Sequence, residues 1–398
     1  MRTISTWIVA AALAVALLGA APAARAAAPL TRQQKLSALF HSLIQPGAPG
    51  LAVLVRYRGR TVFRRGYGMR DLRSGLPVTP RTDFRLASCT KQFTAMAIML
   101  LVQAGKLRYD EPLTEVFPHF PGYGAHITIR ELLNHTSGLQ SYGDWMAKKY
   151  AGQDPWAIPQ IHDAGVLRFE EAQTGTEFEP GSEWKYSNGG YCVLGMCIVR
   201  ASGMSYPAYL RQHIFLPLRM SHTIAYVYGG PPVPQRAYGY TVDAGRWMES
   251  DQDPTSATLG DGGVYTSIAD LTKWDRALYQ HTLLSAAAMQ PAITPPHLPG
   301  HPGEPVPIQG SGWGVNLQTG ARRAGAGIAA QYGFGWFLNP WHGHARMWHE
   351  GETVGFRSVI MRFPHDRLSV ILLANRVDLN LPQLAERVAG LFLSPAGQ

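Results

Sequence analysis

Strand-like segments lie at both ends of this chain, and helix-like segments fill its middle. Near the N-terminus, residues 51–58 have the alternating pattern of a strand, and Arg58-Gly59-Arg60 turns the chain into a second strand over 62–69. Near the C-terminus the strand pattern returns over 333–336, 345–349, 356–363 and 368–374, with Pro364-His365-Asp366 as a hairpin turn. Strands so far apart in the sequence favour one antiparallel sheet built from both chain ends.

Helical spacing of apolar residues predicts the elements around these strands. The predicted helices cover residues 31–44, 88–106, 129–134, 191–201 and 381–393. We therefore expect an α+β fold in which helices flank the antiparallel sheet. The sheet region is expected over about 30–125 and 260–398, with a mostly helical region inserted over about 126–259. A cleft between the two regions is the expected place for a substrate.

The first 26 residues have the layout of a secretory signal peptide. Arg2 gives a basic start, residues 7–19 are apolar, and small residues lead up to Ala26. The alternative is an uncleaved membrane anchor, but an anchor needs about 20 consecutive apolar residues, and Pro22 interrupts the run. We expect cleavage after Ala26, a single catalytic domain over 27–398, and a periplasmic or secreted protein without stable membrane insertion.

The chain carries a formal net charge of +9 at pH 7. Its basic residues are scattered in the sequence and form only short pairs such as Arg64-Arg65, unlike the run or stripe of a nucleic-acid-binding protein. We expect no nucleic-acid partner, although a diffuse positive field would favour anionic substrates. The three cysteines, Cys89, Cys192 and Cys197, are too few for a disulfide framework and are expected to be buried thiols.

The segment Ser88-Cys89-Thr90-Lys91 can support nucleophilic catalysis. Residues three apart share a face of a helix, so the amine of Lys91 can reach the hydroxyl of Ser88. A serine hydroxyl becomes a good nucleophile when a base takes its proton, and a lysine can act as that base if burial lowers its pKa. The alternatives are a capping serine followed by a solvated lysine, and a catalytic thiol at Cys89.

Three segments, in this order, resemble the serine β-lactamase and penicillin-binding-protein superfamily, with its class C β-lactamases, D-alanyl-D-alanine carboxypeptidases and family VIII esterases. Residues 84–95 resemble the nucleophile segment, residues 184–191 the Tyr-x-Asn element, and His349-Glu350-Gly351 the third element, which is Lys-Thr-Gly in β-lactamases. Two flanking segments, 132–139 and 262–267, also resemble the family. The resemblance covers nearly all of the chain after residue 26 and implies a β-lactamase/transpeptidase-like fold.

Carried over position by position, the resemblance implies an acyl-transfer site. Ser88 would attack a carbonyl group and form an acyl-enzyme, while Lys91 and Tyr186 would share the proton relay. Tyr186 would act as a base once Lys91 and its neighbours lower its pKa, or return the proton to the leaving group. Asn188 would offer its amide to Lys91 and to the substrate.

The third element sets expectations about the substrate. His349 stands where β-lactamases have lysine, so the positive charge for a β-lactam carboxylate is only partly present at neutral pH. Glu350 and Glu352 add negative charge on a strand face opposite Gly351, which would let the substrate approach the backbone. By the resemblance, the backbone N–H groups of Ser88 and Glu352 form the oxyanion hole. These features favour a peptide or an ester over a β-lactam.

We expect an exported serine hydrolase that acts through an acyl-enzyme on Ser88. Its substrate would be a small ester or a peptidoglycan-derived peptide, as for a carboxypeptidase or other D-amino-acid peptidase. The alternatives are a β-lactamase proper, and a penicillin- or peptidoglycan-binding sensor of the same fold without turnover. Neither a cofactor nor a metal is expected, because the competing histidine set, His342, His344 and His349, has no acidic or thiol ligand at useful spacing.

Overall fold

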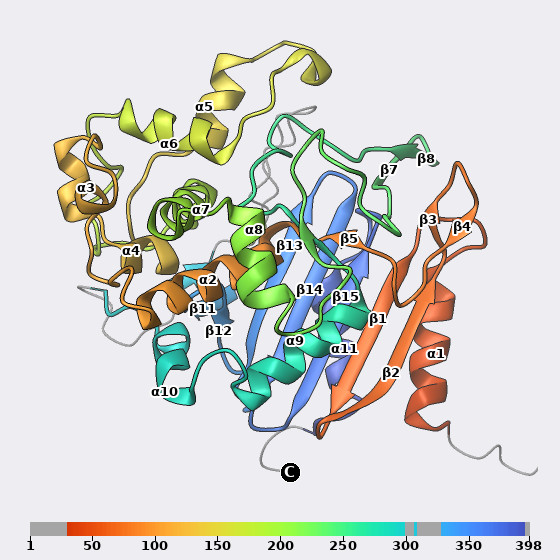
Figure 1. Cartoon of the computed structure of the whole chain (residues 1–398). Helices are drawn as coiled ribbons and strands as arrows, with labels where there is room; N and C mark the ends of the chain where they lie inside the picture. The colour runs from red at the N-terminus through yellow and green to blue at the C-terminus, as the bar shows by residue number, and fades with distance from the viewer. Residues whose placement is uncertain (1–29, 299–305, 309–327, 395–398) are drawn as a thin grey trace, which may run out of the picture.

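The computed structural model describes residues 30–298, 306–308 and 328–394 and is built around one eight-stranded sheet (Figure 1). The strand order is β10-β11-β12-β13-β14-β15-β1-β2, and every neighbouring pair is antiparallel. The start of the chain supplies β1 (Leu51–Tyr57) and β2 (Arg60–Tyr67). The end of the chain supplies β10 (Val306–Ile308), β11 (Ile328–Tyr332), β12 (Phe337–Leu338), β13 (Met347–Thr353), β14 (Phe356–Phe363) and β15 (Leu368–Ala374). The predicted two-ended antiparallel sheet is therefore confirmed.

Different helices cover the two faces of the sheet, because side chains alternate along each strand. Leu51, Val53 and Val55 of β1 share a core with α1 (Arg32–Leu43) and α11 (Leu381–Ala389). Ala52 and Leu54 belong to the opposite core, which contains α2 (Lys91–Gln103) and α9 (Ile268–Gln280). The sheet is thus buried on both faces, consistent with its almost continuously apolar central strands.

A buried carboxylate attaches α9 to the sheet. Asp275 accepts hydrogen bonds from Arg362 Nε at 2.9 Å and Ser369 Oγ at 2.7 Å, and it also pairs with Arg56. These three partners lie on β14, β15 and β1. A carboxylate with such partners fixes the position of the helix over three neighbouring strands.

The helical region packs beside the sheet, around α7 (Asn188–Ser202) (Figure 1). The other helices are α3 (Leu113–Val116), α4 (Ile129–Asn134), α5 (Tyr142–Lys149), α6 (Asp163–Glu171), α8 (Tyr206–Leu210) and, nearer the sheet, α10 (Ala286–Met289). Ser187 caps α7 by accepting the backbone N–H of Gly190 at 2.9 Å, and Gly203 ends it with φ of 71°. These start and stop residues fix where α7 presents its first residue, Asn188.

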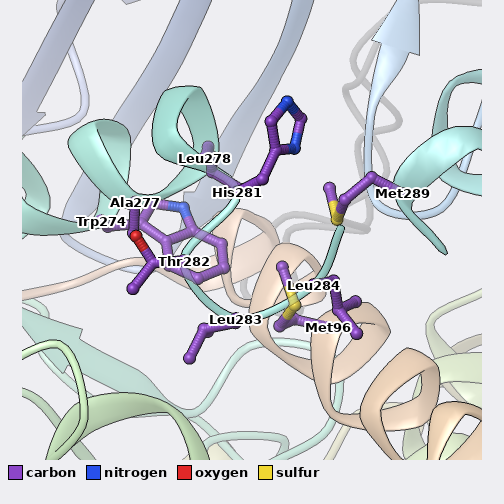
Figure 2. Close-up of a pocket in the computed structure, with 9 residues that line it drawn as sticks. All are labelled: Met96, Trp274, Ala277, Leu278, His281, Thr282, Leu283, Leu284 and Met289. Carbon is purple, nitrogen blue, oxygen red and sulfur yellow. The ribbon is translucent and has the colours of Figure 1, made fainter. Parts of the chain in front are cut away.

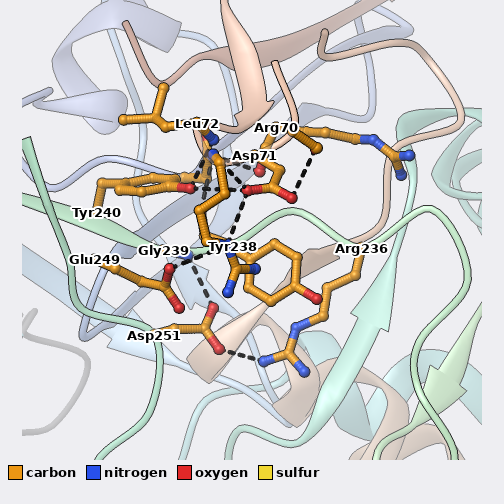
Figure 3. A network of polar contacts seen from close by, with 12 residues as sticks. Arg70, Asp71, Leu72, Arg236, Tyr238, Gly239, Tyr240, Glu249 and Asp251 are labelled. Carbon is orange, nitrogen blue, oxygen red and sulfur yellow. Dashed lines mark hydrogen bonds and ion pairs between the residues drawn. The ribbon is translucent and has the colours of Figure 1, made fainter. Parts of the chain in front are cut away.

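Short strands connect the two regions. They are β3 (Met69–Asp71), β4 (Leu76–Pro77), β5 (Phe84–Arg85), β6 (Ile224–Ala225), β7 (Tyr240–Asp243), β8 (Arg246–Glu249) and β9 (Val264–Thr266). A polar network holds the segment around β7 and β8 against β3 (Figure 3). In it, Leu72 N donates to Tyr240 Oη at 2.8 Å, while Asp251 accepts from Gly239 N at 2.8 Å and pairs with Arg236.

Some local predictions are wrong. Residues 333–336 form the turn between β11 and β12 instead of a strand, because Gly335 has φ of 77° and Gly333 N donates to Trp336 O at 2.8 Å. Ser88 does not begin the long helix but lies in a 3-10 turn, η1 (Ala87–Thr90), before α2. The predicted signal peptide, residues 1–26, lies outside the described residues. Within the described residues no helix has the length and apolar character needed to span a bilayer.

A small apolar pocket lies between α2, α9 and the segment that ends in α10 (Figure 2). It is lined by Met96, Trp274, Ala277, Leu278, His281, Thr282, Leu283, Leu284 and Met289. None of the site residues predicted from the sequence lines it. This pocket is therefore separate from the predicted site.

Candidate active site

Ser88 is presented by a turn held between two sheets. Leu86 N donates to Val264 O at 2.9 Å on one side, and Ser358 Oγ donates to Leu86 O at 2.7 Å on the other. The residue before Ser88, Ala87, has φ of 47°. A left-handed conformation costs an L-residue about 1–2 kcal/mol, and backbone strain of this kind collects at functional sites.

Lys91 lies next to Ser88, at the first position of α2. Its Nζ donates to Ser88 Oγ at 3.2 Å, to Asn188 Oδ1 at 2.8 Å and to the backbone oxygen of Asp261 at 3.0 Å. Burial lowers the pKa of Lys91 to about 8, against an opposing contribution from Asp261. The structure therefore brings Ser88, Lys91 and Asn188 together at the spacing that general-base activation of a hydroxyl requires.

Tyr186 lies beside both Lys91 and Ser88. Lys91 Nζ is 4.9 Å from the ring centre of Tyr186 and 5.4 Å from that of Tyr191, so the two rings flank the ammonium group. Burial raises the pKa of Tyr186 well above its ordinary value, although a hydrogen bond with Ser88 opposes this shift. The expected lowering of this pKa is wrong, and Tyr186 is a neutral phenol that can donate a proton.

His135 is a site residue that the sequence analysis did not single out. It ends α4 with φ of 66°, and its ring is completely buried 4.4 Å from the ring of Tyr186. Its Nδ1 accepts the backbone N–H of Ser187 at 3.1 Å, and its backbone oxygen accepts that of Lys185 at 3.0 Å. His135 thus positions Tyr186 in two ways: it accepts hydrogen bonds from both chain neighbours of Tyr186, and its ring packs against the Tyr186 ring. The sequence signal for His135 was the resemblance of residues 132–139 to the family.

His349 is a neutral, structural side chain. It is 1% exposed, Nδ1 donates to Glu350 O at 2.6 Å, and Nε2 accepts from the Tyr332 hydroxyl at 2.9 Å. Burial, with a contribution from Lys91, lowers the pKa of His349 to about 3. The expectation of a partial positive charge at neutral pH is therefore wrong. His349 therefore offers no positive charge that could bind a β-lactam carboxylate.

Gly351 lies against the nucleophile turn. A Cβ atom there would be 2.1 Å from Leu86 O, 2.4 Å from Ser358 Oγ and 3.1 Å from Ser88 N. The absence of a side chain therefore lets β13 approach the Ser88 turn, a different reason from the substrate approach expected from the sequence.

Glu352 follows Gly351 on β13, so its backbone lies next to the Ser88 turn. The oxyanion hole at the N–H groups of Ser88 and Glu352 stays a prediction. The Glu352 carboxylate lies 3.3 Å from Arg357 Nε, and Arg357 Nη1 donates at 2.8 Å to both Thr353 O and Phe356 O. The negative charge expected at Glu352 is therefore compensated by Arg357.

Asp163 supports the lysine indirectly, and no sequence motif pointed to it. Its carboxylate accepts the backbone N–H groups of Leu259 at 2.9 Å and Gly260 at 3.0 Å, which fixes the loop that presents Asp261 O to Lys91. Burial, followed by the charge of Asp261, raises the pKa of Asp163 to about 7.

A catalytic thiol at Cys89 and a metal site of histidines were the competing chemistries, and the described residues give little support to either. Cys89 is buried, its thiol donates to His349 O at 3.3 Å, and burial raises its pKa to about 12, which excludes a reactive thiolate. His344 is held by Asp366 at 3.0 Å and is not grouped with His349. Among the described residues, the group of ligand atoms close enough to share a metal ion belongs to Asp163, Cys192 and Asp261.

Comparison with known proteins agrees with this geometry. A family described as Beta-lactamase matches residues 31–391. Penicillin-binding protein 4* of Bacillus subtilis (strain 168) is 31% identical over 360 residues, 87% of this chain and 72% of that protein. The chain spans 62% to 72% of the length of the curated relatives that it matches.

Solved structures share the fold. The octameric penicillin-binding protein homologue from Pyrococcus abyssi has a TM-score of 0.72 and 26% identity, with 86% of this chain and 73% of that chain covered. The D-amino acid amidase from Ochrobactrum anthropi SV3, solved with D-phenylalanine, has a TM-score of 0.67 and 24% identity, with 87% and 94% covered. The β-lactamase/transpeptidase fold expected from the sequence is confirmed.

Proposed function

The chain belongs to the beta-lactamase family, and on that basis we propose that it is an exported serine hydrolase that forms an acyl-enzyme on Ser88. The observation that carries the proposal is the 3.2 Å contact between Lys91 Nζ and Ser88 Oγ. A buried lysine with a pKa lowered to about 8 is partly deprotonated near neutral pH, and only its neutral form can accept the serine proton.

The geometry supports a two-step reaction. Neutral Lys91 keeps two N–H donors on Asn188 and Asp261 and accepts the proton of Ser88 as its oxygen attacks the carbonyl group. Tyr186, a neutral phenol, then gives its proton to the leaving group, and the proton that Lys91 took from Ser88 passes to the Tyr186 oxygen, which leaves both side chains neutral. In the second step, water takes the place of the leaving group and the same transfers run in reverse, which releases the acid and restores Ser88.

The proposed substrate is a D-amino-acid peptide, a related amide or a small ester. The neutral state of His349 favours amides and esters without a carboxylate over β-lactams, because no cation from this side chain would hold the β-lactam carboxylate. Two similar proteins point the same way, since one is named a penicillin-binding protein and another, of the same fold, a D-amino acid amidase. An exported protein would meet such peptides in the cell envelope.

Covalent labelling tests the proposal. A fluorophosphonate and a fluorescent penicillin are incubated with the wild type, with Ser88→Ala and with Ser182→Ala, a control serine on a surface turn. Turnover is followed with D-alanyl-D-alanine peptides, D-phenylalanine amide, a nitrophenyl ester and nitrocefin. We expect labelling and turnover in the wild type and the control, and neither in Ser88→Ala. Absence of both from the wild type would overturn the proposal.

The same panel separates the proposed hydrolase from the two alternatives. Fast nitrocefin turnover with no activity on peptides, amides or esters would identify a β-lactamase. Stoichiometric acylation of Ser88 without release would identify a sensor. We expect nitrocefin to be turned over about a hundredfold more slowly than the best amide or ester, since charge-assisted binding of its carboxylate contributes about 1.5–3 kcal/mol.

A further inference from the structure

The net positive charge of this protein comes from its first 70 residues. Ten of the 36 Lys and Arg residues lie there and none of the 27 Asp and Glu residues, so the remainder of the chain is close to neutral. Eight of these ten basic residues lie within α1, the β1–β2 hairpin and their flanks. The fold therefore determines whether this charge is spread out or gathered.

The fold gathers it at one end of the sheet. The tight turn between β1 and β2 contains Arg58 and Gly59 and is followed by Arg60. The neighbouring turn, between β14 and β15, ends in Arg367, whose backbone oxygen accepts Arg58 N at 2.8 Å. The guanidinium group of Arg367 lies 3.0 Å from the position that a Cβ on Gly59 would take. Three arginines from two turns thus meet side by side.

Aromatic rings extend this group to α1. The guanidinium carbon of Arg58 is 5.0 Å from the ring centre of Tyr57, which lies 5.3 Å from the ring of Phe392, and Arg32 lies 5.3 Å over that second ring. Arg64 and Arg65, also exposed on the edge strand β2, pair with Leu54 and Val53 and therefore lie nearer the opposite end of the strands. We call the other four arginines the basic end: Arg32, Arg58, Arg60 and Arg367.

The basic end has no internal charge compensation. Within the described part of the chain, none of its four arginines forms an ion pair with a carboxylate, and Arg32 donates to Leu391 O. The positive field, expected from the sequence to be diffuse, is concentrated at this end of the folded chain. An uncompensated cluster of this size attracts polyanions over about 8 Å, the Debye length at physiological salt.

Folding alone does not favour arginine in these turns. Arg58 has φ of 51° and Arg367 has φ of 54°, both in the left-handed region where glycine and asparagine are preferred. An arginine there destabilises the turn by about 1–2 kcal/mol relative to a residue that tolerates the conformation. Two guanidinium groups at such positions indicate a role outside the protein's own packing.

We propose that the basic end docks the protein on a membrane surface of anionic phospholipid. Guanidinium groups bind phosphate oxygens through paired hydrogen bonds, and turn tips at one end of a sheet can meet a planar surface together. Leu30, 53% exposed beside Arg32, supplies an apolar side chain for the interfacial region.

This orientation leaves the active site accessible. The pairing Gly351–Ser358–Leu373–Ala52 places the site level with the start of β1, whereas Arg58 follows the last residue of that strand. Arg58 is six positions after Ala52 in the chain, or about 20 Å at about 3.3 Å per residue. A protein bound at the basic end would therefore hold its catalytic turn away from the lipid.

Vesicle binding by the full chain tests the proposal. Co-sedimentation at about 0.1 M salt compares vesicles of phosphatidylglycerol and phosphatidylcholine (1:1) with vesicles of phosphatidylcholine alone. The test variant is Arg58→Asn/Arg60→Gln/Arg367→Asn, whose asparagines suit the turn conformation. The matched control, Arg81→Gln/Arg211→Gln/Arg246→Gln, removes three charges from exposed positions elsewhere. All proteins share the same N-terminal segment, so its contribution to binding cancels.

We expect the test variant to bind anionic vesicles about a hundredfold more weakly than the wild type, and the control to lose about threefold or less. Ser88 labelling by a fluorophosphonate in solution should be unchanged in both. Equal losses in the two variants would reduce the effect to net charge and overturn the proposal. Stronger binding to soluble polyphosphate than to anionic vesicles, at equal phosphate, would overturn it in favour of an anionic polymer.

Discussion

The Nζ atom of Lys91 lies 3.2 Å from Ser88 Oγ and has its other two hydrogen-bond partners in Asn188 Oδ1 and Asp261 O. With all three positions occupied, the direction of the proton in the lysine–serine contact depends only on the charge state of the lysine. Charged Lys91 donates to Ser88, and neutral Lys91 accepts from it. The reactivity of Ser88 should therefore follow the titration of one buried amine.

The rate of Ser88 labelling by a fluorophosphonate should accordingly rise with pH. The pKa of Lys91 is lowered to about 8, so the neutral base forms as pH rises through that value. We expect the rate to increase about tenfold per pH unit between pH 6 and 7.5 and to level off above about pH 8.5. A rate that is independent of pH over this range would contradict the role of Lys91 as base.

Variants at this position sharpen the test. Lys91→Arg should lower the labelling rate by about a thousandfold or more, because a guanidinium group stays protonated. Lys106→Arg, at an exposed position after α2, should leave both the rate and its pH profile unchanged. If Lys91→Arg kept the wild-type profile, another base would have to be found.

His135 should act as a positioning residue for Tyr186. His135→Ala removes the acceptor for Ser187 N and the ring 4.4 Å from Tyr186, and we expect kcat to fall about tenfold with little change in KM. His135→Asn keeps an acceptor and tolerates the left-handed backbone, so it should recover much of the loss. A purely structural role predicts instead that both variants lose stability in parallel and that kcat per folded molecule is unchanged.

Gly351→Ala should disturb the nucleophile turn. The added Cβ would lie 2.1 Å from Leu86 O, so β13 or the Ser88 turn must move. Displacements of about 1 Å at a reacting group cost about a hundredfold in rate, and we expect Ser88 labelling to fall by about that factor. Gly122→Ala, where a Cβ would meet no neighbouring atom, is the matched control. Near-wild-type labelling by Gly351→Ala would show that the turn can yield without loss of function.

How well the sequence predicted the structure differed from residue to residue. Strands 356–363 and 368–374 were predicted to the residue, since long apolar runs on either side of a turn leave few alternatives. The Ser88–Lys91 contact followed from helical spacing, and it survives although Ser88 lies in a 3-10 turn.

The sequence did not predict how deeply individual side chains are buried, or which distant residues the fold brings together. The neutrality of His349 and Tyr186 depends on how completely other elements enclose them, and no local pattern encodes that. The basic end joins Arg32, Arg58 and Arg367, which only the sheet order brings together.

A buried acid behind the site gives a last prediction, on stability. Glu170 of α6 is completely buried, and its Oε1 lies 3.3 Å from where a Cβ on Gly189 would be, one residue after Asn188. Burial raises the pKa of Glu170 to about 8, although the backbone of Gln140 opposes the shift. The folded protein therefore keeps this proton over a pH range in which the unfolded chain, with an ordinary carboxyl pKa, has lost it.

Because the folded-state pKa of Glu170 is raised, its contribution to stability is present below about pH 4.5 and is lost as pH rises toward about 8. Glu170→Gln is neutral throughout, so its free energy of unfolding relative to the wild type should increase by about 3–4 kcal/mol between pH 5 and 8. Urea denaturation at both pH values measures this difference, with Glu171→Gln, on the more exposed neighbour, as control. A difference that stays constant with pH would mean that Glu170 ionises as readily in the folded protein as in the unfolded chain, and that α6 accommodates a charge behind Asn188.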